Sequence, residues 1–224
     1  MRLVCLGDSL TAGEYGGSYV NAMRHLRPDL NVINAGVGGD TVLNLQARLD
    51  ADVLAQGPDG VFLMIGGNDA VSWSQPKTRP YYKNAKQVPG GVVTPEAFAR
   101  AYRDLLGRLQ LAHVLVWAGL PPVEANPAVV EAVREFNALA SEAARAYAVP
   151  ALDLMAAFAP ETVPERLPLD VATINTIGAR MQAGWQDYNI AQAAGGYTFT
   201  FDGLHLMPEA AERMGALVAD FIEG

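Results

Sequence analysis

The chain has 224 residues and a formal net charge of −8, and half of its residues are hydrophobic. This length is sufficient for a well-buried core, and we expect residues 1–224 to form one domain. The acidic balance argues against nucleic acid and anionic membranes as partners, because both attract clustered Lys and Arg. No apolar stretch reaches the ~18 residues that a membrane-spanning helix needs.

The N-terminal residues and the cysteine content bear on the compartment. The first apolar run, residues 1–6, is too short for the apolar part of a signal peptide and leads directly into Gly7. Cys5 is the single cysteine, so no disulfide can form within the chain, and we expect a buried thiol. The sequence therefore predicts a cytoplasmic protein unless a leader was removed, and it does not indicate an oligomeric state.

Short apolar runs alternate with amphipathic segments along the chain. The runs predict strands at residues 3–6, 31–35, 60–65, 114–117 and 150–154. Helices are predicted at residues 18–26, at 42–54, from Thr94-Pro95 onwards, at 127–147 and from Pro208 onwards. Because the strands are continuous apolar runs rather than alternating ones, we expect a parallel sheet with helices on both faces, a three-layer α/β/α sandwich.

Two longer segments do not fit this alternation. Residues 71–93 are rich in Pro, Lys, Tyr and Gly, and residues 158–201 mix Pro, Thr, Gly and aromatic residues, with a helix predicted around 174–185. Long loops in a compact domain are usually functional or disordered. Both segments are expected at the carboxyl edge of the sheet, where ligands bind in such folds. We therefore interpret them as loop insertions that form walls or a lid over a site.

Two short motifs near opposite ends of the chain predict a nucleophile and its base. Gly7-Asp8-Ser9-Leu10 follows the first predicted strand, and Asp202-Gly203-Leu204-His205 precedes the last predicted helix. A serine hydroxyl needs a base within hydrogen-bond reach and a third group that orients the base. Ser9, His205 and Asp202 are therefore candidates for a hydrolytic triad, although a serine after a strand often only caps the following helix.

The other histidines and the cysteine content point away from a metal. His25 and His113 have no acidic partner at a comparable spacing, and we assign both to structural positions. Neither a His-x-x-x-His pair nor a cysteine cluster occurs in the sequence, so no metal and no other cofactor is expected. The loop after the first strand also lacks the glycine patterns that bind nucleotides.

Two glycine-rich turns follow the second and third predicted strands. Gly36-Val37-Gly38-Gly39 is either a tight turn or a loop whose backbone N–H groups face a developing oxyanion. Gly66-Gly67-Asn68-Asp69 is either a simple turn or a support for the Asn68 amide, which donates hydrogen bonds without adding a titrating charge. We interpret Asp69 as a local cap or hydrogen-bond anchor.

Together and in this order, the four motifs resemble the SGNH or GDSL hydrolase superfamily. The likeness extends from Leu3 to about Phe221, and residues 34–41 are similar to the bacterial thioesterase I and lysophospholipase branch. The resemblance implies a flavodoxin-like fold with five parallel strands in the order 2-1-3-4-5. The usual α/β-hydrolase pattern does not apply, because the sequence has no Gly-x-Ser-x-Gly elbow.

The resemblance implies a role for each member of the candidate triad. Ser9 attacks an ester carbonyl, His205 takes the serine proton and later protonates the leaving group, and Asp202 holds the imidazole in the required tautomer. The expected protein is thus a serine esterase that hydrolyses small to medium acyl esters, with thioesters also considered, through an acyl-Ser9 intermediate. Its activity should fall as His205 is protonated, near the ordinary histidine pKa of ~6.5.

The resemblance also implies an oxyanion hole. Its expected donors are the backbone N–H groups of Ser9 and Gly39 and the side-chain amide of Asn68, with Gly38 as a rival to Gly39. Three alternatives stay open: a carbohydrate O-acetyl esterase, an acyltransferase with the same residues, and a non-catalytic ligand-binding module on the same fold. The identity of the small-molecule substrate and the length of its acyl chain do not follow from the sequence.

Overall fold

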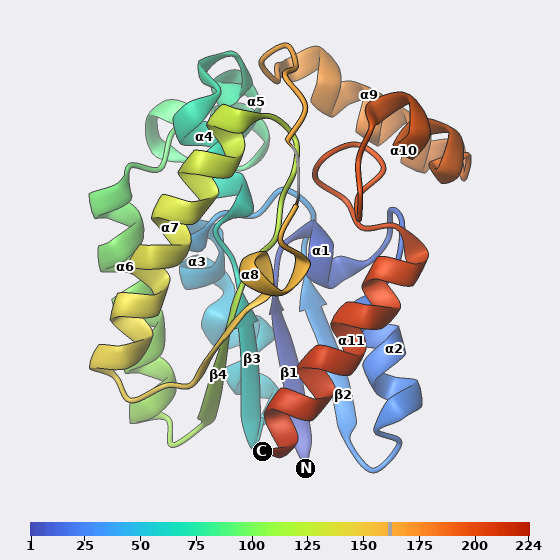
Figure 1. The fold of residues 1–224 in the computed structure, drawn as a ribbon. Helices are drawn as coiled ribbons and strands as arrows, with labels where there is room; N and C mark the ends of the chain where they lie inside the picture. The colour runs from blue at the N-terminus through green and yellow to red at the C-terminus, as the bar shows by residue number, and fades with distance from the viewer. Residues whose placement is uncertain (161–162) are drawn as a thin grey trace.

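Five strands form a parallel sheet in the order β2-β1-β3-β4-β5, as predicted (Figure 1). The structure is a computed structural model, and it describes residues 1–160 and 163–224. The strands are β1 (Arg2–Gly7), β2 (Asn31–Gly36), β3 (Gly60–Met64), β4 (Leu115–Leu120) and β5 (Ala151–Asp153). In this order β1, which leads into Ser9, lies inside the sheet between β2 and β3.

Helices cover both faces of the sheet and give the predicted three layers (Figure 1). Successive residues of a strand point to opposite faces, so Leu3 and Cys5 belong to one buried cluster and Val4 and Leu6 to another. The first cluster includes side chains of α2 (Tyr19–Leu26) and α11 (Pro208–Glu223), and the second includes side chains of α3 (Val42–Asp52), α6 (Pro95–Leu111) and α7 (Pro127–Ala146). Burial on both faces explains why the strands are continuous apolar runs.

The two long helices begin close to the predicted residues, and a polar side chain caps each of them. The Thr94 hydroxyl accepts a hydrogen bond from the Ala97 N–H at 3.2 Å, directly before α6. Asn126 does the same for α7, with its Oδ1 3.0 Å from the Val129 nitrogen. Both helices then start with a proline, whose missing N–H would have no partner in the first turn.

Residues 71–93 are largely helical, which corrects the expectation of a loop. They contain the end of α4 (Gly67–Ser74), the single turns η2 (Pro76–Thr78) and η3 (Pro89–Gly91), and α5 (Arg79–Ala85). These pieces are too short to show a helical period in the sequence. Their packing comes from separate buried side chains, among them Tyr82, Val88 and Val93.

Residues 158–201 also contain more regular structure than expected. The helix expected around 174–185 corresponds to α9 (Val171–Gln182), whereas α10 (Tyr188–Gly195) was not predicted. Residues 161–162 of this segment lie outside the described residues. In Figure 1, α9 and α10 lie beyond the carboxyl ends of the strands, on the same side as α1 (Ser9–Ala12). The remaining short elements are η1 (Leu54–Gln56) and α8 (Leu154–Phe158).

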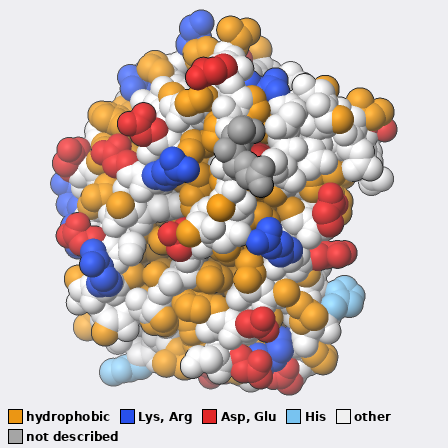
Figure 2. All heavy atoms as spheres, viewed as in Figure 1, with side chains coloured by type: hydrophobic (Ala, Val, Ile, Leu, Met, Phe, Trp, Pro, Cys, Tyr) orange, Lys and Arg blue, Asp and Glu red, His pale blue; other side chains and the backbone are white. Residues whose placement is uncertain are grey.

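Charged side chains are dispersed over the face drawn in Figure 2. Lys and Arg side chains lie singly among Asp and Glu side chains there and do not form a patch. Within the described residues, no helix has both the length and the apolar character needed to cross a membrane. This face of the molecule therefore offers no concentrated positive charge to a polyanion.

Candidate active site

Ser9 is the first residue of α1, and only Asp8 separates it from the end of β1. Asp8 caps this short helix, because its Oδ1 accepts a hydrogen bond from the Leu10 N–H at 3.0 Å. At Gly7 a side chain would collide with Thr11 and with the Met64 carbonyl, so the tight turn needs glycine. As the first helical residue, Ser9 has a backbone N–H without a partner inside the helix. The turn thus presents the Ser9 hydroxyl and N–H at the carboxyl edge of the sheet.

The turn from Asp202 to His205 carries the predicted acid and base. Asp202 Oδ1 accepts hydrogen bonds from the backbone N–H groups of Leu204 at 3.0 Å and His205 at 2.8 Å, so the carboxylate stabilises its own turn. Gly203 has a φ of 88°, and a Cβ at this position would collide with the backbone of Ala125. Glycine is therefore required between the acid and the base.

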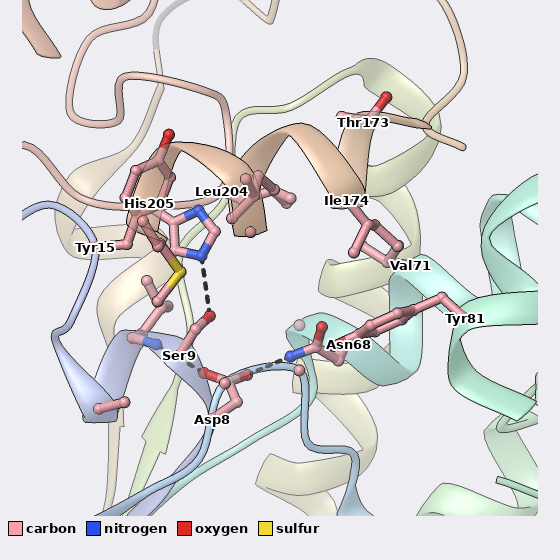
Figure 3. A pocket seen from close by; sticks show the side chains of 18 of the residues that line it. Asp8, Ser9, Tyr15, Asn68, Val71, Tyr81, Thr173, Ile174, Leu204 and His205 are labelled. Atoms are coloured by element: carbon pink, nitrogen blue, oxygen red, sulfur yellow. Dashed lines mark hydrogen bonds between the residues drawn. The ribbon is translucent and has the colours of Figure 1, made fainter. Parts of the chain in front are cut away.

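The three predicted triad residues form one hydrogen-bonded chain, and Figure 3 shows the part of it that joins His205 to Ser9. Asp202 Oδ2 lies 2.8 Å from His205 Nδ1, and Nε2 of the same ring lies 3.1 Å from Ser9 Oγ. With its proton on Nδ1, facing the carboxylate, the imidazole has a free lone pair on Nε2 for the serine proton. His205 is 6% exposed, so the base is largely shielded from water. This arrangement can activate a serine hydroxyl.

Electrostatics around His205 favour its protonated form. Burial lowers the pKa of His205, but the charge and hydrogen bond of Asp202, with a smaller effect of Asp8, raise it overall above its usual value. Burial raises the pKa of Asp202, but the His205 contact and the backbone N–H groups of its turn lower it overall. Asp202 is therefore suited to remain ionised and to stabilise an imidazolium.

Asn68, in the first turn of α4, lies on the opposite side of Ser9 from His205 (Figure 3). Its Nδ2 donates a hydrogen bond to Asp8 Oδ2 at 3.2 Å, and its Oδ1 accepts one from the Tyr82 hydroxyl at 2.9 Å. These two partners fix the plane of the amide and occupy one of its two N–H groups. The second N–H has no partner among the described residues and can donate to a ligand beside Ser9. Burial raises the pKa of Asp8 to about 6.

Gly38 and Gly39 line the same cleft as Ser9. Their turn is held by a hydrogen bond from the Val37 N–H to the Gly7 carbonyl at 3.1 Å. Gly39 has a φ of 78° and packs against Tyr81 so closely that a Cβ would collide with the phenol. Neither glycine N–H donates a hydrogen bond to another described residue. Both glycines therefore remain candidate donors to an oxyanion.

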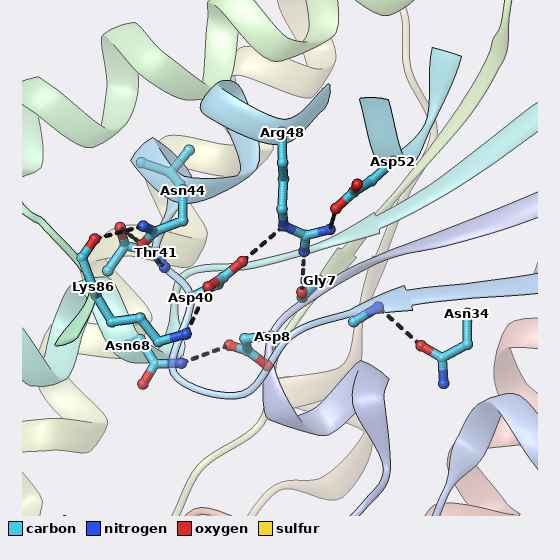
Figure 4. A network of polar contacts seen from close by, with 12 residues as sticks. Gly7, Asp8, Asn34, Asp40, Thr41, Asn44, Arg48, Asp52, Asn68 and Lys86 are labelled. Carbon is cyan, nitrogen blue, oxygen red and sulfur yellow. Dashed lines mark hydrogen bonds and ion pairs between the residues drawn. The ribbon is translucent and has the colours of Figure 1, made fainter. Parts of the chain in front are cut away.

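A nearly buried ion-pair network supports the loop after β2 (Figure 4). Asp40 accepts hydrogen bonds from Arg48 Nε at 2.8 Å and from Lys86 Nζ at 2.9 Å, and its side chain is 5% exposed. Arg48 Nη2 also donates to the Gly7 carbonyl at 3.0 Å. The network thereby connects the glycine turn to the end of β1, immediately before Asp8 and Ser9.

A cleft of about 610 Å³ opens above the triad. The apolar part of its lining includes Leu10, Val71, Pro121, Pro122, Val123, Leu169, Ile174, Ile177, Met181 and Leu204. Tyr15, Tyr81 and Tyr82 add aromatic rings, and Asp8 and Glu14 add acidic side chains. The described residues that line the cleft include neither Lys nor Arg. The cleft is therefore suited to an uncharged, largely apolar ligand.

Three supporting residues were not identified from the sequence. Asp8 and Tyr82 hold the Asn68 amide, and Arg48 holds the Gly7 carbonyl. Asp8 stands inside a motif, but its contact with α4 has no local signal, and Tyr82 lies in a segment that was expected to be a loop. Asp69 was interpreted as an anchor, and its carboxyl oxygens do accept hydrogen bonds from the Val42 N–H at 3.0 and 3.3 Å.

The remaining histidines lie outside the cleft. His25 is exposed and its Nδ1 lies 2.7 Å from the Asn21 carbonyl, within α2. His113 is exposed in the turn before β4, with a φ of 58°. Among residues 1–160 and 163–224, no group of three or more His, Cys, Asp or Glu side chains is arranged to hold a metal ion.

Comparison with known proteins assigns the family. The model of the GDSL-like Lipase/Acylhydrolase family matches residues 5–213, nearly the whole chain. The chain belongs to this family. The match includes all four motifs on which the resemblance to GDSL hydrolases was based. Family membership supports the expected class of enzyme, a carboxylic ester hydrolase.

Individual relatives match parts of the sequence or the fold. An acetylxylan esterase of Geobacillus stearothermophilus is 37% identical over 92 residues, 33% of this chain and 41% of that protein. The uncharacterized lipoprotein YqeF of Bacillus subtilis is 36% identical over 86 residues, 34% of this chain and 35% of that protein. The matches thus span less than half the length of either relative. A lipase/acylhydrolase structure from Enterococcus faecalis has a TM-score of 0.67 and 22% identity, over 100% of this chain and 95% of that one, and shares the fold.

Proposed function

We propose that this GDSL family member hydrolyses carboxylic esters and that Ser9 is its nucleophile. The observation that supports this most strongly is the hydrogen-bonded chain from Asp202 through His205 to Ser9, with heavy-atom distances of 2.8 and 3.1 Å. Serine is a weak nucleophile at neutral pH and needs a positioned base. His205 supplies this base at the opening of an apolar cleft.

The reaction has two steps. As Ser9 Oγ attacks the ester carbonyl, its proton moves to His205 Nε2, and Asp202 stabilises the resulting imidazolium. When the tetrahedral intermediate collapses, His205 returns the proton to the leaving alkoxide and the acyl group remains on Ser9. A water molecule, deprotonated by His205, then releases the carboxylic acid and restores the serine.

The oxyanion is stabilised by neutral donors. The backbone N–H groups of Ser9 and Gly39 and the second N–H of Asn68 Nδ2 all face the region beside Ser9 Oγ in this proposal. Asn68 is suited to the role because Asp8 and Tyr82 restrain its amide before the substrate arrives. A donor that is already oriented does not need to reorganise as charge develops on the carbonyl oxygen.

The cleft favours acyl groups of several carbons. Ile174, Ile177 and Met181 share one face of α9 and line the cleft that contains Ser9. Each methylene transferred from water to such a wall contributes roughly 0.8 kcal/mol. We therefore expect small to medium acyl esters to be hydrolysed, with the medium ones preferred over acetate.

An O-acetylated carbohydrate is the second candidate substrate. The observation in its favour is the 37% identity with an acetylxylan esterase. The aromatic rings of Tyr15 and Tyr81 at the cleft offer amphipathic contact surfaces for such a ligand.

Because one relative is a lipoprotein, the cytoplasmic location expected from the sequence stays a prediction.

Labelling with a fluorophosphonate tests the proposal. The probe phosphonylates a serine that has an active base, and peptide mapping should locate the label on Ser9. Ser9→Ala and His205→Ala should both remain unlabelled. A folded wild-type protein without label, or with label on another serine, would contradict the proposal and favour the non-catalytic ligand-binding module. Product analysis with added alcohols then separates hydrolysis from acyl transfer.

A further inference from the structure

Glu124 is a fully buried acidic residue in the loop between β4 and α7. Its carboxylate accepts hydrogen bonds from the backbone N–H groups of Thr198, Phe199 and Thr200, at 2.7 to 3.0 Å. It also accepts from the hydroxyl groups of Thr198 and Thr200, both at 2.7 Å. One side chain thus binds three consecutive residues that lie more than 70 positions further along the chain.

This carboxylate is stabilised by neutral donors alone. Within the part of the chain that the structure describes, Glu124 forms no ion pair. A buried carboxylate is costly unless its lone pairs are satisfied by hydrogen bonds. An apolar side chain would fill the space without that cost, so packing alone does not explain an acidic residue here. The hydrogen-bond donors around Glu124 therefore indicate which segment its carboxylate keeps in place.

The residues bound by Glu124 are connected directly to the turn of the candidate acid and base. The Thr200 hydroxyl donates to Glu124 and also accepts a hydrogen bond from the Gly203 N–H at 3.0 Å. On the other side of the same residue, the Gly203 carbonyl accepts from the backbone N–H of Glu124 at 3.0 Å. The Gly203 carbonyl is therefore bound by Glu124 directly, and the Gly203 N–H is bound through the Thr200 hydroxyl. Gly203 itself lies between Asp202 and Leu204.

Two further backbone contacts hold the Asp202–His205 turn between the residues that precede it and those that end it. The Phe201 N–H donates to the His205 carbonyl at 3.1 Å, and Thr200 forms an isolated antiparallel bridge with Leu206. The segment that ends at Thr200 therefore determines where His205 stands. Glu124 is not among the described residues that line the cleft, so it acts on the turn and not on the substrate.

We propose that Glu124 is a positioning residue for the catalytic base. By fixing Thr200 and both peptide groups of Gly203, it holds the Asp202–His205 turn in the position in which His205 Nε2 lies 3.1 Å from Ser9 Oγ. This inference rests on the proposed function, because the geometry it protects is that of a serine nucleophile and its base.

Glu124→Gln is the first variant to test. An amide has one acceptor oxygen, and both oxygens of Glu124 face backbone N–H groups, so either orientation places an NH2 against a donor. We expect kcat to fall about 10- to 100-fold with little change in KM, because the base is displaced and substrate contacts remain. The acid limb of kcat/KM should also move to lower pH, because a displaced turn weakens the contact with Asp202 that raises the pKa of His205.

A matched pair of threonine variants separates positioning from general support. Thr200→Val and Thr198→Val each remove one hydroxyl that donates to Glu124 at 2.7 Å, but only the Thr200 hydroxyl continues to Gly203. Thr200→Val should reproduce the lower kcat and the shifted acid limb, and Thr198→Val should leave both near wild type. Equal effects of the two variants on the acid limb would overturn the proposal, and this pair decides if Glu124→Gln does not fold.

An NMR titration of His205 tests the positioning role of Glu124 separately from the proposed esterase function. The ring C–H resonances report the pKa of His205 without any substrate. A lower pKa in Glu124→Gln and Thr200→Val, together with a displaced Nδ1–H resonance, would support the role of Glu124. An unchanged pKa in both variants would overturn it. A wild-type protein without Ser9-dependent turnover would instead overturn the proposed function.

Discussion

Nε2 of His205 lies 3.1 Å from Oγ of Ser9, although the two residues are 196 positions apart in the chain. Ser9 stands at the end of a strand inside the sheet, and His205 stands in the turn before α11, which packs beside α2 on one face of that sheet. The nucleophile is therefore fixed by the core, whereas the base is fixed by hydrogen bonds within and around its turn. Changes in that turn should affect activity more than they affect the fold.

Activity should fall as the pH decreases through the pKa of His205. Asp202 and Asp8 raise this pKa above the ordinary value of about 6.5, so the acid limb of kcat/KM should have its midpoint above that value. Activity is lost on the acid side because only the neutral imidazole accepts the serine proton. Rates with a p-nitrophenyl ester from about pH 5 to 9 measure the limb. A flat profile would contradict the role of His205 as the base.

Asn68→Ala should lower kcat by about 100- to 1000-fold, because one donor to the oxyanion is lost. Tyr82→Phe keeps this donor but frees the amide oxygen that accepts from Tyr82 at 2.9 Å. Loss of one such hydrogen bond, about 1.4 kcal/mol, should cost roughly tenfold in kcat.

Tyr102→Phe provides a matched control for Tyr82→Phe. Tyr102 is also fully buried, but its hydroxyl has no hydrogen-bond partner among the described residues. Its removal should leave kcat unchanged. If the two tyrosine variants have equal kcat values, the hydroxyl of Tyr82 does not orient Asn68.

Much of the fold was predictable because its signals are local. Continuous apolar runs indicated strands buried on both faces, Thr94-Pro95 indicated where one long helix begins, and a second was placed correctly from about Pro127. The strand order came from the family resemblance and was correct. The helices α4, α5 and α10 have at most eight residues each and lack the one-sided apolar spacing that indicated α2, which is equally short.

Ile177→Trp should shift the preferred acyl chain to shorter lengths, because the larger ring fills the cleft on the α9 side. The ratio of kcat/KM between octanoate and acetate p-nitrophenyl esters measures the shift. Ile190→Trp is the matched control, since Ile190 lies on α10, is 70% exposed and does not line the cleft. An unchanged ratio in Ile177→Trp would mean that the acyl chain binds elsewhere.

Asp69→Asn should flatten the dependence of stability on pH. Burial raises the pKa of Asp69 to about 8, against about 3.9 in an unfolded chain. Between these values the folded state binds more protons, so the wild-type free energy of unfolding should decrease as the pH rises through this window. Urea unfolding at about pH 5 and 8 compares the two proteins. If both lose the same stability, Asp69 does not remain protonated in the folded protein.

The supporting contacts of the site could not be predicted, because they join segments that are distant in the sequence. Asp8 and Asn68 are 60 residues apart, and Glu124 binds residues beyond position 197. In the sequence, Glu124 is one acidic residue after two prolines, and Tyr82 is one aromatic residue in an irregular segment. Their partners become visible only when the strand order has brought their loops to one edge of the sheet.

Hydrolysis of p-nitrophenyl esters by the wild type and by Ser9→Ala tests the central claim most directly. We predict turnover by the wild type and a decrease of on the order of a thousandfold or more in Ser9→Ala. The melting temperature should change by no more than a few degrees, since among the described residues the Ser9 side chain forms a hydrogen bond only to His205. Turnover retained by a folded Ser9→Ala protein would contradict the assignment of Ser9 as the nucleophile.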